Sequence, residues 1–318
     1  MKIGVMTSGG DAPGMNAAIR SVVRNGIYHN HEVVGILRGY LGLINREFKE
    51  MHSRDVGGIL NRGGTILLTA RAPQFCQEEV QEKAIQALRE EGIDSLIVIG
   101  GNGSQTGAYR LHQKGFPVIG IASTIDNDLV GTDQTIGFDT ALNNAIGAID
   151  KIRDTATSHE RVFVIEVMGR NAGFLAMHCG IAVGADEIIV PEIAYDIENI
   201  VQRIQSSFNL GKKHFIIILA EGAGKASSFS ERLAEFGGID AKVSVLGYIQ
   251  RGGDPTYIDR FLATNFGAFA IYAVTHGIRG KIVGIKNNEI TLVNMHEVVG
   301  KVKSIDASLS QILEALSI

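Results

Sequence analysis

The sequence predicts an α/β protein with mostly parallel sheets, and two observations support this. Short apolar runs with the length of buried strands occur at 3–6, 33–37, 95–99, 118–122, 162–168, 187–190, 215–220, 243–248 and 281–285. Amphipathic stretches typical of helices lie between many of them, at 15–28, 78–91, 138–153 and 197–208. Strands that alternate with helices indicate βαβ units, because parallel neighbours need a long crossover connection.

One hairpin signal occurs, near the end of the chain. Asn287 and Asn288 separate the apolar stretches 281–286 and 289–293. Asparagine suits the left-handed positions of a two-residue β-turn. We therefore expect an antiparallel pair at the edge of a sheet.

Composition limits the classes of function. The chain has 318 residues and a net charge of −4, so no overall basic field predicts binding to nucleic acid or to an anionic membrane. No apolar run approaches the roughly 20 residues that span a bilayer, and the N-terminal residues lack a signal peptide's apolar region. Two cysteines, Cys76 and Cys179, are too few for a disulfide framework. We expect a cytoplasmic protein without nucleic-acid or membrane partners.

Two glycine loops follow strand-like runs and open helical patterns. The first reads TSGGDAPGMN at 7–16, and the second reads GGNGS at 100–104. Glycines let backbone N–H groups approach a phosphate, and a helix N-terminus favours negative charge. Either loop alone is equally well explained as a tight turn, and neither has the Walker A or Rossmann spacing. Two loops at carboxyl ends of strands would line one crevice of an open sheet, which favours nucleotide binding.

An acidic loop, TIDND at 124–128, follows the run at 118–122. Of two carboxylates two residues apart, one can accept a hydroxyl proton while the other helps to hold a divalent metal. Phosphoryl transfer needs little more than alignment and charge neutralisation. An Asx-rich turn is the commoner outcome of this spacing alone.

Arginines beside glycines, turns and strand ends could bind phosphate oxygens through their guanidinium forks. They are Arg62, Arg71, Arg161, Arg170 and Arg251. Arg20 and Arg24 share a helix face at i,i+4 spacing, and with Lys212, Lys213 and His214 they could form a second anion site. A solvated basic face explains those five residues equally well.

The chain resembles bacterial ATP-dependent 6-phosphofructokinases across its whole length. The resemblance rests on the order and spacing of seven motifs, which are TSGGDAPGMN (7–16), RGGT (62–65), GGNGS (100–104), TIDND (124–128), DKIRDT (150–155), VMGR (167–170) and QRGG (250–253). It implies two Rossmann-like three-layer α/β domains with mostly parallel sheets and the active site in the cleft between them. An ATP-binding domain would comprise 1–137 plus 250–301, and a sugar-phosphate-binding domain 138–249 plus 302–318.

The resemblance also implies an activity, namely transfer of phosphate from ATP to the 1-hydroxyl of fructose 6-phosphate in glycolysis. The catalytic residues would be Asp126 as base, with Thr124 and Arg170 stabilising the transferring group. Mg²⁺ would be held with the help of Asn102 and Asp128. The ATP site would be lined by Gly10, Tyr40, Arg71, Ala72, Gly101, Asn102, Gly103, Ser104 and Gly107. The sugar phosphate would be held by Thr124, Ile125, Asp126, Arg161, Met168, Gly169, Arg170, Glu221, Lys242, Tyr248 and Arg251.

Assembly and regulation are implied in the same way. The family forms homotetramers in which Arg161 would reach the 6-phosphate bound by a neighbouring subunit. An allosteric site for ADP or phosphoenolpyruvate would comprise Arg20, Arg24, Arg153, Gly184, Asp186, Lys212, Lys213 and His214.

The chain departs from the family pattern at several positions. Asn102 replaces an Asp near the metal, Lys242 replaces an Arg and Tyr248 a His of the sugar-phosphate site, and Phe174 and Leu210 replace a usual Asp and Arg. These changes leave open a regulatory subunit that binds both ligands but turns over slowly. A pyrophosphate-dependent or different-sugar kinase is a third possibility, although Gly103 and Ser123 stand where pyrophosphate-using relatives carry Asp and Lys.

Overall fold

The computed structural model describes residues 1–305, which form two compact units. The first unit comprises Met1–Thr140 and Arg251–Lys303, and the second comprises Ala141–Gln250 and takes up the chain again at Ser304. The predicted assignment of ATP and sugar phosphate to separate domains stays a prediction. Of the last predicted segment, 302–318, the part from residue 306 on lies outside the described residues.

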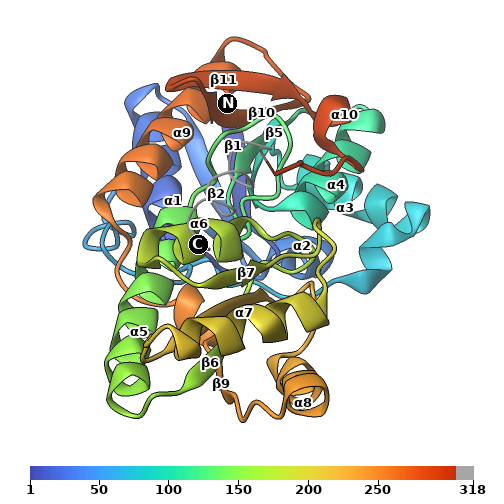
Figure 1. The fold of residues 1–318 in the computed structure, drawn as a ribbon. Coiled ribbons are helices and arrows are strands. Elements are labelled where there is room, and N and C mark those ends of the chain that lie inside the picture. Colours follow the sequence, from blue (N-terminus) through green and yellow to red (C-terminus); the bar gives the residue numbers. More distant parts are fainter. Residues whose placement is uncertain (306–318) are drawn as a thin grey trace. The chain divides into compact units, whose positions relative to one another are not determined.

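The first unit contains a seven-stranded sheet (Figure 1). The strand order is β11 (Glu289–Asn294), β10 (Lys281–Lys286), β5 (Val118–Ala122), β4 (Ser95–Gly100), β1 (Lys2–Thr7), β2 (Glu32–Ile36) and β3 (Phe48–Glu50). The five inner strands are parallel, and an antiparallel strand closes each edge. The apolar run of β4 is buried at every position, as a strand covered on both faces requires. The predicted α/β fold with mostly parallel sheets is confirmed.

The predicted hairpin is also confirmed. β10 and β11 pair antiparallel with Lys286 opposite Glu289. Asn287 and Asn288 between them have φ values of 52° and 64°. Positive φ at both turn residues matches the twist of the flanking strands.

Helices cover both faces of this sheet. They are α1 (Met15–Tyr28), α2 (Gly39–Ile44), α3 (Glu78–Glu90), α4 (Asn102–Gln113), α9 (Tyr257–Thr275) and the short α10 (Met295–Val298). Figure 1 shows α1 and α9 on one face and α3 and α4 on the other. A Cβ on Gly267 of α9 would lie 2.6 Å from Cβ of Ser21 in α1, so α1 and α9 pack with backbones close together.

The second unit is built on a four-stranded parallel sheet. Its order is β7 (Glu187–Ile189), β8 (Phe215–Ala220), β6 (Val162–Val167) and β9 (Lys242–Val245). Its helices are α5 (Phe138–Ser158), α6 (Phe174–Val183), α7 (Ile197–Asn209) and α8 (Ala226–Gly237). The first three residues of α5 belong to the first unit. Apolar residues of β6 and β8 pack with α7 and α8 in a buried core.

The predicted strand at 243–248 is wrong in its second half. β9 ends at Val245, and Gly247–Arg251 is a 3₁₀ turn. Gly247 has φ 55°, which lies outside the extended region and ends the strand.

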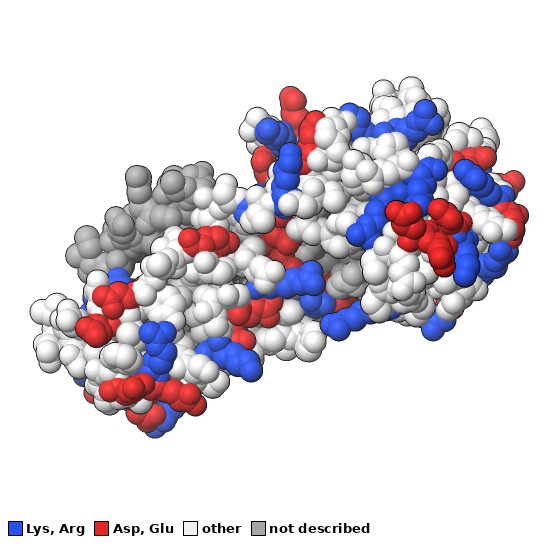
Figure 2. Space-filling view, turned by 90° about the vertical axis from the view of Figure 1, so that its right-hand side faces the viewer, with Lys and Arg blue, Asp and Glu red and all other residues white. Residues whose placement is uncertain are grey.

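No helix among residues 1–305 is long and apolar enough to cross a membrane. Figure 2 shows acidic and basic side chains interspersed on the face in view.

Candidate active site

The two glycine loops meet where the strand order of the first unit reverses. From β1 the chain runs to β2 on one side, and β4 later pairs with the other side of β1. The backbone N–H of Ser8 donates to the carbonyl of Ile99 at 3.0 Å, and a Cβ on Gly100 would lie 2.5 Å from the Ser8 carbonyl oxygen. The predicted adjacency of the loops is therefore confirmed. Ligands of open α/β sheets bind at such a switch point.

The first loop carries an arginine over its backbone. A Cβ on Gly10 would lie 2.6 Å from Nη1 of Arg251, and this nitrogen is 3.8 Å from Oδ1 of Asp11. Gly9 has φ 86°, and a Cβ there would lie 3.0 Å from Oγ of Ser104. The structure thus brings Gly10, predicted for ATP, next to Arg251, predicted for the sugar phosphate.

The N-terminus of α4 forms the second loop and is suited to an anion. Gly101 occupies the N-cap position without a side-chain cap, and the first turn holds no acidic residue. A Cβ on Gly103 would meet nothing within 4 Å, so the space over this turn is open. Uncapped backbone N–H groups at the positive end of a helix are a ready phosphate site.

Tyr40 supports α4 from α2. The side chain is buried, its hydroxyl donates to the Ser104 carbonyl at 2.6 Å, and its ring lies 4.1 Å from that of Phe75. A Cβ on Gly107 would come within 2.6 Å of this ring, so only glycine fits beside it. Burial raises the pKa of the Tyr40 phenol well above its ordinary value, so the hydroxyl stays a proton donor.

Arg71 and Ala72 lie just before a 3₁₀ turn at Pro73–Cys76, and the Arg71 side chain is exposed. Thr69, two residues earlier, donates from Oγ1 to the Gly9 carbonyl at 2.7 Å. This bond fixes the segment to the first glycine loop.

The acidic loop lies beside α4, because β5 is the neighbour of β4. The Ser123 N–H donates to the Gly100 carbonyl at 3.2 Å, and a Cβ on Gly101 would lie 3.2 Å from Cβ of Thr124. Asp126 is 9% exposed, and its N–H donates to Oγ1 of Thr124 at 3.2 Å. The three predicted loops therefore lie together at one edge of the sheet.

The oxygen atoms in this region are suitable ligands for a divalent metal. Asp126, Asp128 and Asn102 offer oxygen ligands, and Nδ2 of Asn102 donates to the Asp128 carbonyl at 3.3 Å, which ties the amide to the loop. Within 1–305 no three His, Cys, Asp or Glu side chains form a metal cage. Mg²⁺ in phosphoryl-transfer sites commonly uses only one or two carboxylates, with phosphates and waters completing its shell.

The carboxyl edge of the second unit's sheet gathers other predicted residues. Glu221 follows β8, and its Oε1 accepts from the N–H groups of Gly169 at 3.3 Å and Arg170 at 2.5 Å. Gly169 has φ 145° and Arg170 φ 59°, so the carboxylate stabilises a turn that extended backbone could not form. Gln250 is fully buried and its Oε1 accepts from the Met168 N–H at 3.3 Å.

Two predicted residues lie at the opposite edge of that sheet. Arg161 immediately precedes β6 and Lys242 opens β9, next to Phe163 in register. Strand β6 separates this edge from Gly169 by roughly 20 Å, at about 3.3 Å per residue. The structure therefore does not bring Arg161 and Lys242 of one chain to Glu221. Lys242 instead pairs with Asp240 at 2.7 Å, which lowers the pKa of that carboxyl.

The predicted allosteric residues of the second unit lie at the same amino edge, whereas Arg20 and Arg24 belong to α1 of the first unit. Arg153 donates to the carbonyls of Val183 and Gly184, and Lys212 forms an ion pair with Asp186. His214 lies 3.0 Å from Oγ1 of Thr157, and Lys213 pairs with Glu160. In the first unit, burial and the neighbouring charge of Arg24 lower the pKa of Arg20.

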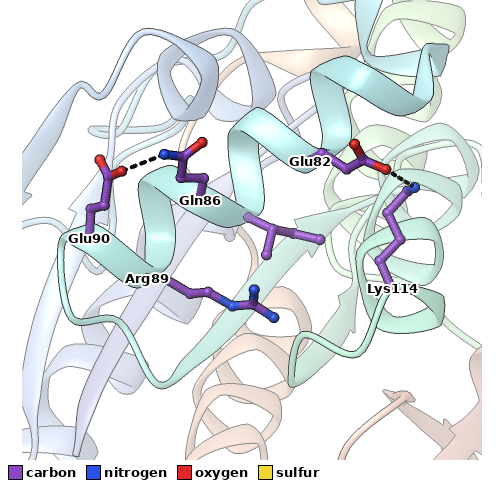
Figure 3. A pocket seen from close by; sticks show the side chains of 6 residues that line it. Glu82, Gln86, Arg89, Glu90 and Lys114 are labelled. Carbon is purple, nitrogen blue, oxygen red and sulfur yellow. Dashed lines mark hydrogen bonds and ion pairs between the residues drawn. The ribbon is translucent and has the colours of Figure 1, made fainter.

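A pocket of about 410 Å³ lies away from all these residues, along α3 (Figure 3). Lys114 reaches across it to Glu82 at 3.1 Å, and Ile85 lines it between exposed polar side chains. No predicted site residue lines it.

Sequence reasoning missed the residues that hold the acidic loop. Asn127, Thr135 and Asp259 are buried polar residues with two or more hydrogen bonds each in this region. For Asn127 the sequence signal is its place between the two Asp residues of the TIDND motif.

Glycine loops and paired carboxylates at a sheet switch point define an α/β protein equipped to bind a phosphorylated ligand. More narrowly, the chain belongs to the phosphofructokinase family, since the model of the family described as "Phosphofructokinase" matches residues 2–274.

Curated relatives match over the full length. A protein of Bacillus licheniformis named ATP-dependent 6-phosphofructokinase is 52% identical over 317 residues, covering 100% of this chain and 99% of its own. Proteins with the same name from Halalkalibacterium halodurans and Bacillus subtilis are 53% and 51% identical with the same coverage.

Solved structures agree in fold. A phosphofructokinase from Saccharomyces cerevisiae matches with TM-score 0.85 and 37% identity, over 99% of this chain and 47% of the yeast chain. A pyrophosphate-dependent phosphofructokinase from Marinobacter aquaeolei matches with TM-score 0.86, over 99% of this chain and 91% of that one. At 22% identity this second match shows the fold alone.

Proposed function

We propose that this chain is an ATP-dependent 6-phosphofructokinase. It transfers the γ-phosphoryl group of ATP to the 1-hydroxyl of fructose 6-phosphate and yields fructose 1,6-bisphosphate and ADP. The observation that carries the proposal is the buried Asp126 beside the uncapped N-terminus of α4. Relatives at about half identity over the whole length bear the same activity in their names. The setting is the glycolysis of the cytoplasm.

ATP occupies the switch point of the first unit. The phosphates lie against N–H groups of the α4 N-terminus and of the first glycine loop, because N–H groups at a helix N-terminus without a hydrogen-bond partner bind anions. Gly103 leaves room over α4 for the nucleotide, which supports ATP over pyrophosphate. The proposed contacts are Gly10, Tyr40, Arg71, Ala72, Gly101, Asn102, Gly103, Ser104 and Gly107.

Asp126 acts as the base. Its carboxylate takes the proton of the sugar's 1-hydroxyl while that oxygen attacks the γ-phosphorus, and the bond to the bridging oxygen of ADP breaks. Thr124 and Arg170 stabilise the charge on the transferring group. Mg²⁺, held with the help of Asp128 and Asn102, would supply charge neutralisation on the ATP phosphates. Since Asn102 contributes an amide rather than a carboxylate, its hold on the metal is weaker.

Fructose 6-phosphate binds residues that two copies of the chain supply. Ile125, Met168, Gly169, Glu221, Tyr248 and Arg251 serve the bound sugar phosphate together with the catalytic residues. Arg161 and Lys242 serve the site of a neighbouring subunit. The separation of roughly 20 Å between the two edges of the sheet supports this division. The functional unit is then an oligomer, proposed as a homotetramer.

The proposed domains follow the two ligands. An ATP-binding domain comprises 1–137 plus 250–301, and a sugar-phosphate-binding domain 138–249 plus 302–318. An effector site for ADP or phosphoenolpyruvate comprises Arg20, Arg24, Arg153, Gly184, Asp186, Lys212, Lys213 and His214. In the second unit, carbonyl and ion-pair contacts hold Arg153, Lys212 and Asp186 in place.

A coupled assay of ADP release from ATP and fructose 6-phosphate with Mg²⁺ tests the proposal. The protein should turn over at about 1 s⁻¹ or faster. Asp126→Ser should lower kcat by about 10²–10⁴. Asp94→Asn is the matched control, because Asp94 is exposed and lies before the amino end of β4. An inactive protein that still binds both substrates would favour a regulatory subunit, and turnover with pyrophosphate instead of ATP would overturn the choice of donor.

A further inference from the structure

Asn127 occupies a special position between the two acidic residues of the site. It is 3% exposed and has φ 50°, a left-handed conformation in which asparagine is among the least strained side chains. The backbone therefore leaves the extended conformation between Asp126 and Asp128. Both the turn and the side chain of Asn127 can influence where the two carboxylates lie.

The Asn127 amide binds the backbone at two nearby positions of the segment that follows, Asp133 and Thr135. Its Oδ1 accepts from the Thr135 N–H at 3.1 Å, and its Nδ2 donates to the Asp133 carbonyl at 3.1 Å. The amide thus pairs one backbone N–H group and one carbonyl of this irregular segment. In a buried position such bonds are costly to lose, because the partners stay unpaired.

Thr135 completes the connection to the start of the acidic loop. It is fully buried, and its Oγ1 lies 2.6 Å from the Thr124 carbonyl and 3.3 Å from Oδ1 of Asn127. A hydroxyl has one proton, so the shorter contact to Thr124 is the hydrogen bond. Thr135 therefore touches the acidic loop on both sides of Asp126.

The hydrogen bonds of Asn127 and Thr135 form a brace for the acidic loop, and the segment 132–137 that carries it is bonded to a strand and a helix of the first unit. The Asp133 N–H donates to the Ile285 carbonyl of β10 at 2.7 Å, and the Ile285 N–H donates to Oγ1 of Thr132 at 3.0 Å. The Gly137 N–H donates to Oδ1 of Asp259 in α9 at 2.8 Å. The segment 132–137 is thereby held at both ends by a strand and a helix.

We propose that Asn127, together with Thr135, is a positioning residue that fixes the base Asp126 relative to α4 and to the transferring phosphoryl group. The inference rests on the proposed kinase function. Asn127 touches neither substrate and acts through Asp126. A displacement of about 1 Å in a reacting group can cost roughly 10²-fold in rate, so the loss of the amide acts mainly on kcat.

The first test separates the backbone from the amide. Asn127→Gly keeps the left-handed turn and removes all side-chain bonds. It should lower kcat roughly 10²-fold, the scale of a misplaced catalytic group, and leave KM for ATP within about threefold. Thr135→Val should also lower kcat. Thr135→Ser, which keeps the hydroxyl, should retain most of the wild-type kcat. Each kcat is referred to the folded fraction, measured by circular dichroism.

The second test is a double-mutant cycle with the base. If Asn127 acts through Asp126, Asn127→Gly should change kcat by less than about threefold in an Asp126→Ser background. A merely structural role would lower kcat by the same factor in both backgrounds and overturn the proposal. A normal kcat for Asn127→Gly in an active enzyme would overturn it as well, while the kinase assignment would stand. A wild-type protein without kinase activity would overturn both.

Discussion

Asp259 couples the stability of the first unit to pH. It is fully buried at the start of α9, and burial raises the pKa of its carboxyl from 3.8 to about 6. Its Oδ1 accepts from the Gly137 N–H and its Oδ2 from the N–H and hydroxyl of Thr140. These hydrogen bonds favour the charged form and oppose part of the rise.

The sign of the effect follows from proton binding. Between pH 3.8 and about 6 the folded protein holds a proton on Asp259 that the unfolded chain has released. The contribution to the free energy of unfolding is therefore complete below 3.8 and is lost as the pH rises through about 6. The difference between these limits is about 3 kcal/mol, from 1.36 kcal/mol for each pKa unit.

Urea unfolding at a series of pH values from about 4 to about 8 measures this contribution. The chain has no Trp, so far-UV circular dichroism is the suitable signal. Asp259→Asn should be less stable throughout, because an amide cannot accept from both sets of donors, but it should lack the decline in stability between pH 3.8 and about 6. The difference between the two curves isolates Asp259 from other carboxyl groups. Protein concentration is held constant to exclude effects of assembly.

A second variant should move the transition to higher pH. Thr140→Val removes a hydroxyl that stabilises the charged carboxylate, so the pKa of Asp259 should rise further and stability should be lost at higher pH. Parallel curves for the wild type and Asp259→Asn across this range would refute the assignment of the raised pKa to Asp259.

Two further predictions concern α4. Gly107→Ala would place Cβ 2.6 Å from the Tyr40 ring and should lower the free energy of unfolding, measured in urea, by about 1–3 kcal/mol. Gly103→Ala meets open space and should lower ATP affinity without loss of stability. Equal losses of stability in the two variants would contradict this. Asn102→Asp adds a carboxylate near Asp128 and should lower the Mg²⁺ concentration for half-maximal activity; an unchanged value would exclude residue 102 as a determinant of metal binding.

The strands were predictable because buried parallel strands are continuous apolar runs with sharp ends. The hairpin was predictable because two asparagines tolerate the required positive φ. β3 was missed, since two of the three residues of Phe48–Glu50 are charged and no alternation marks them. The end of β9 was misjudged because the conformation of Gly247 cannot be read from an apolar stretch.

The loops of the candidate site were predictable as a group, since carboxyl ends of adjacent parallel strands meet at one edge. The sequence was a poorer guide to which edge of the sheet an arginine lies at. Arg161 lies at the amino edge, far from Glu221. The brace of the acidic loop was invisible for another reason. Asp259 bonds to Gly137 across 122 positions of sequence, and no local spacing encodes such a contact.

The discontinuous first unit has a consequence for synthesis on the ribosome. Until the chain has passed Arg251, β5 is an edge strand without β10, and the apolar face of α1 lacks α9. The segment Ala141–Gln250, which makes up most of the second unit, emerges before that point. Because domains fold as they emerge, the sheet of the second unit can form while the first unit still exposes an unpaired strand. Premature termination between these two stages would leave a product prone to aggregation through β5.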